Sequence, residues 1–204
     1  MNHSEPNGPP PEAYSRVTNP ECFRPLHTFM VELIGRLEAA FDVERLEGYG
    51  LDDELEKGDL VRPSVRLVPR DQSAAPILMS FTAFPGLRVR FGRWYIDAFP
   101  SCGCDACDET ADGEATRLTQ MVDDVTGGRF REATWMPLVG DAWQESEFRS
   151  PRGRSSSRTS VDRLHATRLL AGSDSLQFEW RPWPREKKAE RTIPSSDAPT
   201  RRLQ

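Results

Sequence analysis

A continuous apolar stripe near the N-terminus constrains the fold of this chain more than any other sequence feature. Between residues 26 and 41 the apolar side chains recur every three or four positions: Leu26, Phe29, Met30, Leu33, Ile34, Leu37, Ala40 and Phe41. This spacing places them on one face of an α-helix, with Glu32 and Arg36 on the opposite face. Such a helix must cover an apolar surface that the rest of the chain supplies.

The middle of the chain supplies that surface as short strands. Residues 65–68 and 77–84 are rich in β-forming side chains, and residues 87–91 alternate strictly between apolar residues and arginine. Strict alternation is typical of a strand with one buried and one solvated face. We therefore predict an antiparallel meander over residues 64–99, with the helix packed on it.

Further elements follow the meander. A helix is predicted from about Asp112 to Gly127, and a third helix that Ser160 caps and Gly172 ends. Residues 130–135 and 176–180 read as strands. The expected fold class is α+β, a mainly antiparallel sheet with two to three helices packed on it.

Polar and proline-rich composition sets the expected domain boundaries. Only 37% of the residues are hydrophobic, and the polar surplus lies at the two ends. We expect disordered tails at residues 1–13 and 185–204, because such segments bury too little apolar surface to fold. A single α+β domain is expected over residues 14–184, with an exposed loop at residues 150–160.

Charge and hydropathy limit the partners and the compartment. The net charge of −5 combines an acidic body up to residue 149 with a basic stretch after it. An acidic body repels a phosphate backbone, so nucleic acid is not an expected partner. The sequence shows no secretory signal and no apolar run long enough to cross a bilayer. We expect a cytoplasmic protein without a membrane partner, in which cysteines stay reduced.

Three cysteines within six residues form the one cluster where chemistry is expected: Cys102, Cys104 and Cys107. Thiolates are preferred zinc ligands, and a tight turn containing glycine brings two or three of them to one tetrahedral centre. A closed site needs a fourth ligand. Cys22 and His27 are the candidates, and His165 is a more distant one.

Two other interpretations of the cysteines stay open. Cys104 and Cys107 have the spacing of a redox pair next to a helix start, although Asp105 and Asp108 would raise a neighbouring thiol pKa. Alternatively, the three cysteines are reduced residues packed at a turn, with Asp108 or Asp112 as the helix cap.

Other polar groups have a bland and a functional interpretation. The acidic residues 52–59 are expected to form a solvated loop rather than a cation site. Arg88, Arg90 and Arg93 would share the wet side of the meander, as a solvated face or as a clamp for an anionic ligand. Four late tryptophans are candidates for a groove or interface: Trp135, Trp143, Trp180 and Trp183.

Established catalytic motifs are absent from the sequence. It has no phosphate-binding glycine loop, no nucleophile elbow and no paired-histidine helix motif. The leading hypothesis is a non-catalytic binding domain for a protein or small molecule, with a structural zinc at the cysteines. The alternative is a thiol-dependent redox enzyme or sensor that uses Cys104 and Cys107.

Several segments together resemble a bacterial domain family of unknown function. They are residues 14–27, the Cys-Gly-Cys-Asp-Ala-Cys-Asp signature at 102–108, residues 128–131 and the Trp-Arg-Pro-Trp-Pro segment at 180–184. The resemblance covers residues 14–184. It implies a single domain, and it assigns no activity to any residue.

Overall fold

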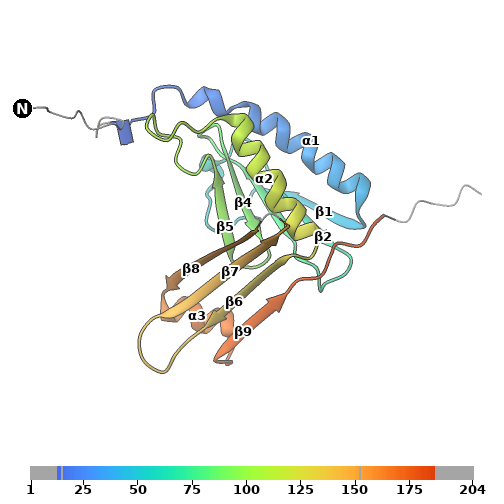
Figure 1. Cartoon of the computed structure of the whole chain (residues 1–204), viewed down its shortest axis with the longest axis vertical. Helices are drawn as coiled ribbons and strands as arrows, with labels where there is room; N and C mark the ends of the chain where they lie inside the picture. Colours follow the sequence, from blue (N-terminus) through green and yellow to red (C-terminus); the bar gives the residue numbers. More distant parts are fainter. Residues whose placement is uncertain (1–12, 15, 152, 187–204) are drawn as a thin grey trace, which may run out of the picture.

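The computed structural model describes residues 13–14, 16–151 and 153–186, and in them the chain forms two antiparallel sheets and three α-helices (Figure 1). The helices are α1 (Pro25–Ala40), α2 (Ala111–Thr126) and α3 (Arg163–Leu170), with short 3-10 turns η2 (Pro20–Phe23) and η3 (Lys57–Asp59). The strands are β1 (Val43–Gly48), β2 (Ser64–Pro69), β3 (Ile77–Phe81), β4 (Leu87–Phe91), β5 (Tyr95–Phe99), β6 (Phe130–Trp135), β7 (Ala142–Ser150), β8 (Gly153–Val161) and β9 (Ser175–Glu179). The predicted α+β class with mainly antiparallel sheet is confirmed.

The first sheet is the predicted meander. Its order is β1-β2-β3-β4-β5, and each strand pairs antiparallel with the next one in sequence. The alternating positions of β4 divide as predicted, because Leu87, Val89 and Phe91 are buried while Arg88 and Arg90 lie on the opposite face. The connections from β2 to β5 are short, whereas residues 49–63 between β1 and β2 form a longer acidic loop that includes η3.

Helices α1 and α2 lie side by side over the apolar face of this sheet (Figure 1). The stripe of α1 is buried as predicted: Leu26, Met30, Leu33, Ile34 and Leu37. Helix α2 directs Leu118, Val122 and Val125 into the same core. The amphipathic stripe and the meander therefore account for one layer of helices on one sheet.

The second sheet has the order β8-β7-β6-β9 and extends the same core. Phe130 of β6 and Phe148 of β7 pack with ring centroids 4.7 Å apart, and both belong to the main apolar cluster. Helix α3 covers a smaller cluster, in which Ala166 and Leu170 pack on Ala142. The main apolar cluster therefore contains residues of both sheets.

The predicted exposed loop at residues 150–160 is wrong, because residues 153–161 form the edge strand β8. The exposure itself is correct: β8 has no buried residue. Its serine, threonine and arginine side chains show no apolar alternation, but its backbone pairs along the whole length of β7. A strand held by backbone hydrogen bonds at a sheet edge needs no apolar side chains, so periodicity missed it.

Three predicted boundaries also change. Ser160 lies within β8, and the side chain of Asp162 caps α3 by accepting the backbone N–H groups of residues 164 and 165. Ala13, the last residue of the predicted N-terminal tail, is buried. Arg185 forms a β-bridge with Phe41, and the next residue also bonds to the end of α1. The remaining residues of both predicted tails lie outside the described residues.

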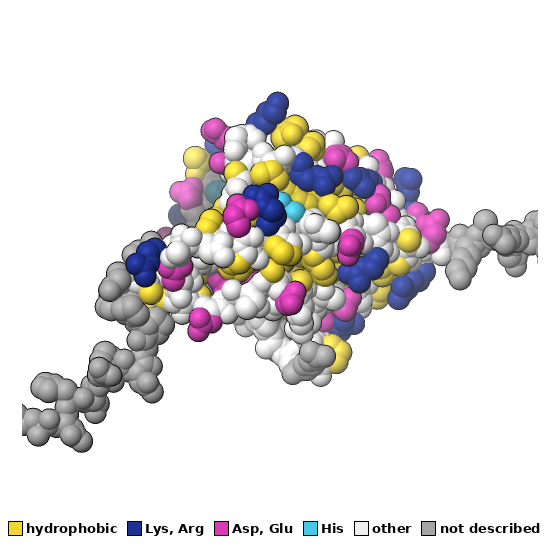
Figure 2. All heavy atoms as spheres, turned by 90° about the horizontal axis from the view of Figure 1, so that it is seen from above, with side chains coloured by type: hydrophobic (Ala, Val, Ile, Leu, Met, Phe, Trp, Pro, Cys, Tyr) yellow, Lys and Arg dark blue, Asp and Glu magenta, His cyan; other side chains and the backbone are white. Residues whose placement is uncertain are grey.

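Figure 2 shows the molecule from above relative to Figure 1, and acidic and basic side chains are interspersed on this face. None of the helices in the described ranges is long and apolar enough to span a bilayer.

Candidate functional site

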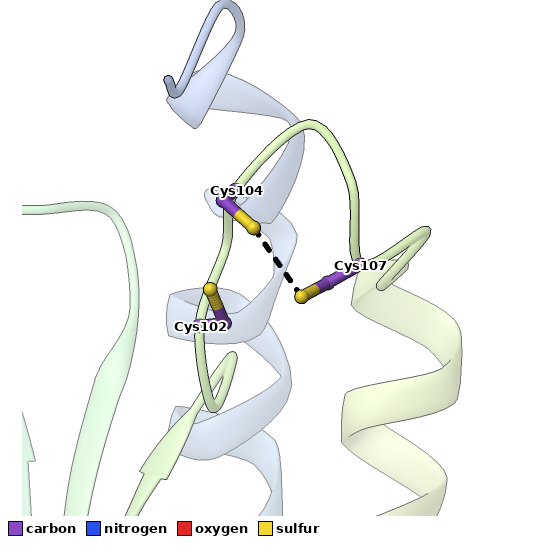
Figure 3. A group of neighbouring side chains, drawn as sticks. All are labelled: Cys102, Cys104 and Cys107. Carbon is purple, nitrogen blue, oxygen red and sulfur yellow. Dashed lines mark hydrogen bonds between the residues drawn. The ribbon is translucent and has the colours of Figure 1, made fainter. Parts of the chain in front are cut away.

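The three clustered cysteines lie on the loop between β5 and α2, as the sequence predicts. Their Sγ atoms all lie within 4.8 Å of one another. Figure 3 shows Cys102 and Cys107 directing their sulfurs toward Cys104, and the Cys104–Cys107 Sγ distance is 3.3 Å. A tetrahedral zinc with bonds of about 2.3 Å sets its sulfurs about 3.8 Å apart, a value between the 3.3 Å contact and the 4.8 Å limit of this cluster.

The glycine between the first two cysteines permits the turn that joins them. Gly103 has a φ of +72°, a conformation that a side chain disfavours. A Cβ at this position would also lie 3.0 Å from the ring of Phe84 and 3.1 Å from Pro100. The backbone can therefore pass close to Phe84 and turn Cys104 inward, where it is 7% exposed.

A carboxylate holds the first half of the loop from inside. Glu109 accepts backbone N–H groups from Ser101, Cys102 and Gly103 at 3.0, 3.1 and 2.7 Å. Three donors on one carboxylate fix the backbone that carries Cys102. Glu109 was not predicted as part of the site, because nothing in the neighbouring sequence distinguishes it from a solvated acidic residue.

A second carboxylate ties the loop to the N-terminal segment. Asp105 accepts the Thr18 backbone N–H at 2.8 Å and the Arg16 Nε at 3.0 Å, and its own N–H donates to the Arg16 carbonyl. The hydrogen bonds from Thr18, followed by those from Arg16, lower the Asp105 pKa. Asp105 is therefore a charged carboxylate held by Thr18 and Arg16. The groups that shift the Cys104 and Cys107 pKa values are the neighbouring thiols, burial and backbone N–H groups rather than Asp105.

The thiols themselves are electrostatically unequal. Hydrogen bonds from Cys102 and Cys107, and then from the backbone N–H groups of Ala106 and Cys107, lower the pKa of the Cys104 thiol. Hydrogen bonding to Cys104, followed by that to Cys102, raises the Cys107 pKa to about 12. Cys104 is thus the sulfur around which the other groups are arranged.

The helix after the loop is capped by a residue that the sequence analysis did not choose. Thr110 Oγ1 accepts the Gly113 N–H at 3.1 Å, so neither Asp108 nor Asp112 is the cap. Asp108 instead has a φ of +50°, which helps the chain turn between Cys107 and the helix.

The candidates for a fourth ligand are placed differently. Cys22 is exposed and lines the same small pocket, of about 220 Å³, as Cys104. His27 Nε2 contacts the Gly86 carbonyl at 2.8 Å, which occupies one of its two ring nitrogens. His165 is on α3, which packs on the second sheet. The described thiol cluster includes none of the three.

The acidic loop and the arginines of β4 bind one another. The prediction that residues 52–59 and the arginine face are both solvated is therefore wrong in part. Asp52 is 3% exposed and accepts Arg88 Nη1 and Arg90 Nη2, each at 3.1 Å. Glu54 pairs with both arginines as well. The loop folds back onto the outer face of the meander, which sequence periodicity cannot show.

A buried carboxylate joins the two sheets. Glu132 of β6 accepts the backbone N–H groups of Arg93 and Trp94 at 2.7 and 3.0 Å and the Trp180 indole N–H at 3.0 Å. Burial is the main cause that raises its pKa to about 7. Sequence analysis missed Glu132 because its partners lie up to 48 residues away.

A family model described as a family of unknown function (DUF6226) matches residues 2–187. The chain belongs to this family. The predicted membership of a domain family of unknown function is therefore confirmed, and DUF6226 assigns no activity to the cysteine loop. No curated protein and no solved structure matches the chain.

Proposed function

We propose that this member of DUF6226 is a non-catalytic cytoplasmic binding domain whose cysteine loop holds a structural zinc ion. The zinc proposal rests on the convergence of three thiols within 4.8 Å on one loop. Zinc would replace the weak contacts between thiols with bonds to thiolates, which suits a soft divalent ion.

Cys22 is the fourth ligand in this proposal. It lines the same pocket as Cys104, whereas His27 already contacts a backbone carbonyl through Nε2. Cys22 belongs to η2, directly before α1. Zinc would therefore connect the start of α1 to the loop that leads from β5 into α2, and this supports a structural role.

The size of the space around the cysteines also favours a structural role over catalysis. The pocket beside Cys104 has about 220 Å³, below the roughly 300 Å³ at which ligand sites begin. The two carboxylates beside this pocket already accept hydrogen bonds: Glu109 from the backbone of the loop and Asp105 from the N-terminal segment.

Metal analysis of full-length protein purified without chelator tests the metal clause. One zinc per chain is expected in the wild type, and Cys104→Ser and Cys107→Ser are expected to lose most of it. Cys22→Ser should lower zinc affinity more than His27→Gln does, and Ser101→Ala serves as a control that keeps all thiols. A wild-type protein without stoichiometric zinc would overturn the metal clause.

A redox role is the second candidate, because Cys104 and Cys107 Sγ lie 3.3 Å apart with the spacing of redox pairs. A disulfide or peroxide oxidant would take two electrons, and the two thiols would lose two protons as their disulfide forms. Mass spectrometry after exposure to oxidised glutathione would show this bond. The redox role fails if neither thiol forms it and neither is alkylated faster than a free thiol at neutral pH.

A further inference from the structure

A pocket of about 480 Å³ lies on the side of the meander opposite α1. Its walls come from the outer face of β2, β3 and β4, the turn after β4, α3 and the segment after β9. The residues that matter to its chemistry are Arg66, Leu78, Arg90, Arg93, Trp94 and Trp180. Its volume lies within the range of small-molecule sites.

Strand register creates the floor of this pocket. Arg66 of β2 is directly opposite Leu78 of β3, and Leu78 is directly opposite Arg90 of β4. Residues paired in this way point to the same face of a sheet, on strands about 4.8 Å apart. Two guanidinium groups therefore flank an apolar floor, with their Cα atoms about 10 Å apart.

The positive charge of the pocket is only partly balanced. Within the described ranges, neither Arg66 nor Arg93 has a carboxylate at ion-pair distance, and no acidic residue lines the pocket. Arg93 lies over the ring of Phe178, 4.3 Å from its centroid. Arg90 is paired with Asp52, Asp53 and Glu54, so the unbalanced positive charge of the pocket comes from Arg66 and Arg93, and it favours an anion over a neutral ligand.

Arg90 contributes an unused donor. Its Nη2 atom binds Asp52 and Asp53 at 3.1 and 2.8 Å, which fixes the side chain. Its Nε atom is buried and has no hydrogen-bond partner among the residues that the structure describes. A buried donor without a partner destabilises the folded protein, and an oxygen of a bound anion would supply the partner once a small movement of the lining exposes Nε.

The aromatic walls are held in place before any ligand binds. Glu132 accepts the backbone N–H of Trp94 and the indole N–H of Trp180. Trp180 also stacks on Phe178, with centroids 5.0 Å apart. A rigid indole wall beside guanidinium groups suits a planar apolar body that carries an anionic group.

We infer that this pocket binds a small organic anion, with a carboxylate or phosphate group on an aromatic or other planar apolar body. The arginines would bind the anionic group, and Leu78, Trp94 and Trp180 would contact the apolar body. This inference rests on the proposed binding role, for which it names the ligand class. It does not depend on zinc, because no cysteine lines the pocket.

Isothermal titration calorimetry on the full-length protein tests the inference with four probes: phenyl phosphate, benzoate, inorganic phosphate and benzyl alcohol. Phenyl phosphate or benzoate is expected to bind with a Kd below about 1 mM, and which of them binds tighter distinguishes phosphate from carboxylate recognition. Inorganic phosphate should bind at least about tenfold more weakly, and benzyl alcohol should not bind measurably.

Arg66→Gln and Arg93→Gln should each weaken binding of the better probe about tenfold, because neither side chain has an ion pair that its loss would break. Arg36→Gln on α1 removes the same charge outside the pocket and should leave affinity unchanged. The fold of each variant is checked by circular dichroism. The inference is overturned if neither aromatic anion binds, if benzyl alcohol binds equally well, or if all three variants behave alike.

Zinc content measured on the same samples separates the two proposals. Arg66→Gln and Arg93→Gln should retain the metal content of the wild type. Anion binding by a protein without zinc would remove the metal clause alone. A zinc protein that binds none of the probes would remove this inference alone.

Discussion

Glu109 in the cysteine loop and Glu132 between the sheets perform the same task in different surroundings. Each carboxylate accepts three N–H groups. The donors to Glu109 are three consecutive residues on a surface loop. Those to Glu132 come from the turn between β4 and β5 and from the segment after β9. Glu132 is 0% exposed, so water can neither replace its hydrogen-bond donors nor solvate its carboxylate. The comparison indicates that burial, rather than the number of hydrogen bonds, decides how much each contact stabilises the protein.

The largest effect is expected from Glu132→Ala. This change leaves two backbone N–H groups and the Trp180 indole N–H buried without an acceptor. The free energy of unfolding should fall by about 3 to 5 kcal/mol, measured by urea denaturation. Glu44→Ala on β1, where the carboxylate is half exposed, should cost less than about 0.5 kcal/mol. Equal costs for the two changes would contradict the role of Glu132.

A pH series sharpens the contrast further. The Glu132 pKa is raised from 4.5 to about 7 in the folded protein, so the folded state binds more protons than the unfolded state between these values. Its contribution to stability is complete below about pH 4.5 and is lost as the pH rises through about 7. From pH 5 to 7.5 the unfolding free energy should decrease by about 2 to 3 kcal/mol.

Glu132→Gln is the matched variant for the pH series, because glutamine keeps the shape without the titration. It should be less stable than the wild type at pH 5, and its unfolding free energy should change little between pH 5 and 7.5. If the unfolding free energy of the wild type falls no more than that of Glu132→Gln over this interval, burial does not raise the Glu132 pKa in the folded protein.

Glu109→Ala should have a smaller effect than Glu132→Ala. The three N–H groups it leaves lie at a partly solvated loop, where water can bind them, so a loss of about 1 to 2 kcal/mol is expected. Hydrogen exchange should show faster exchange at residues 101–103 and unchanged exchange in β6. A loss as large as that for Glu132→Ala would break the comparison.

The smallest effect concerns backbone crowding in the loop. Gly103 and Gly140 both have positive φ angles, but only Gly103 lies against other side chains. Gly103→Ala should therefore destabilise the protein by about 0.5 to 1 kcal/mol more than Gly140→Ala, as measured by thermal or urea unfolding. Identical effects would mean that Phe84 and Pro100 move aside without cost.

The cysteine loop was predictable from the sequence because its three thiols are close together along the chain. Cys102, Cys104 and Cys107 form a pattern with a known chemical meaning, and the flanking strand and helix were both predictable from periodicity. The anchors of the loop were not predictable in the same way. Asp105 anchors the loop by accepting hydrogen bonds from Arg16 and Thr18, which lie 87 or more residues away.

The outer face of the meander shows the opposite limit. Arg88 and Arg90 were correctly placed on one face by alternation, but the acidic loop that covers them was expected to be solvated. Asp52 reaches them across 36 and 38 residues. Arg66 lines the pocket because strand register places it opposite Leu78, and no sequence pattern predicts that pairing.

The amino-acid sequence alone determined the α1 stripe, the alternation of the meander and the position of the thiols, because each depends on neighbours within a few residues. The tertiary structure alone decided that the polar residues of β8 form a strand, that Glu132 joins two sheets and that arginines from two strands face one pocket. These features depend on strand register and on backbone hydrogen bonds between distant segments. Side-chain periodicity reports which face of an element is buried, and it carries no information about which distant group will lie opposite.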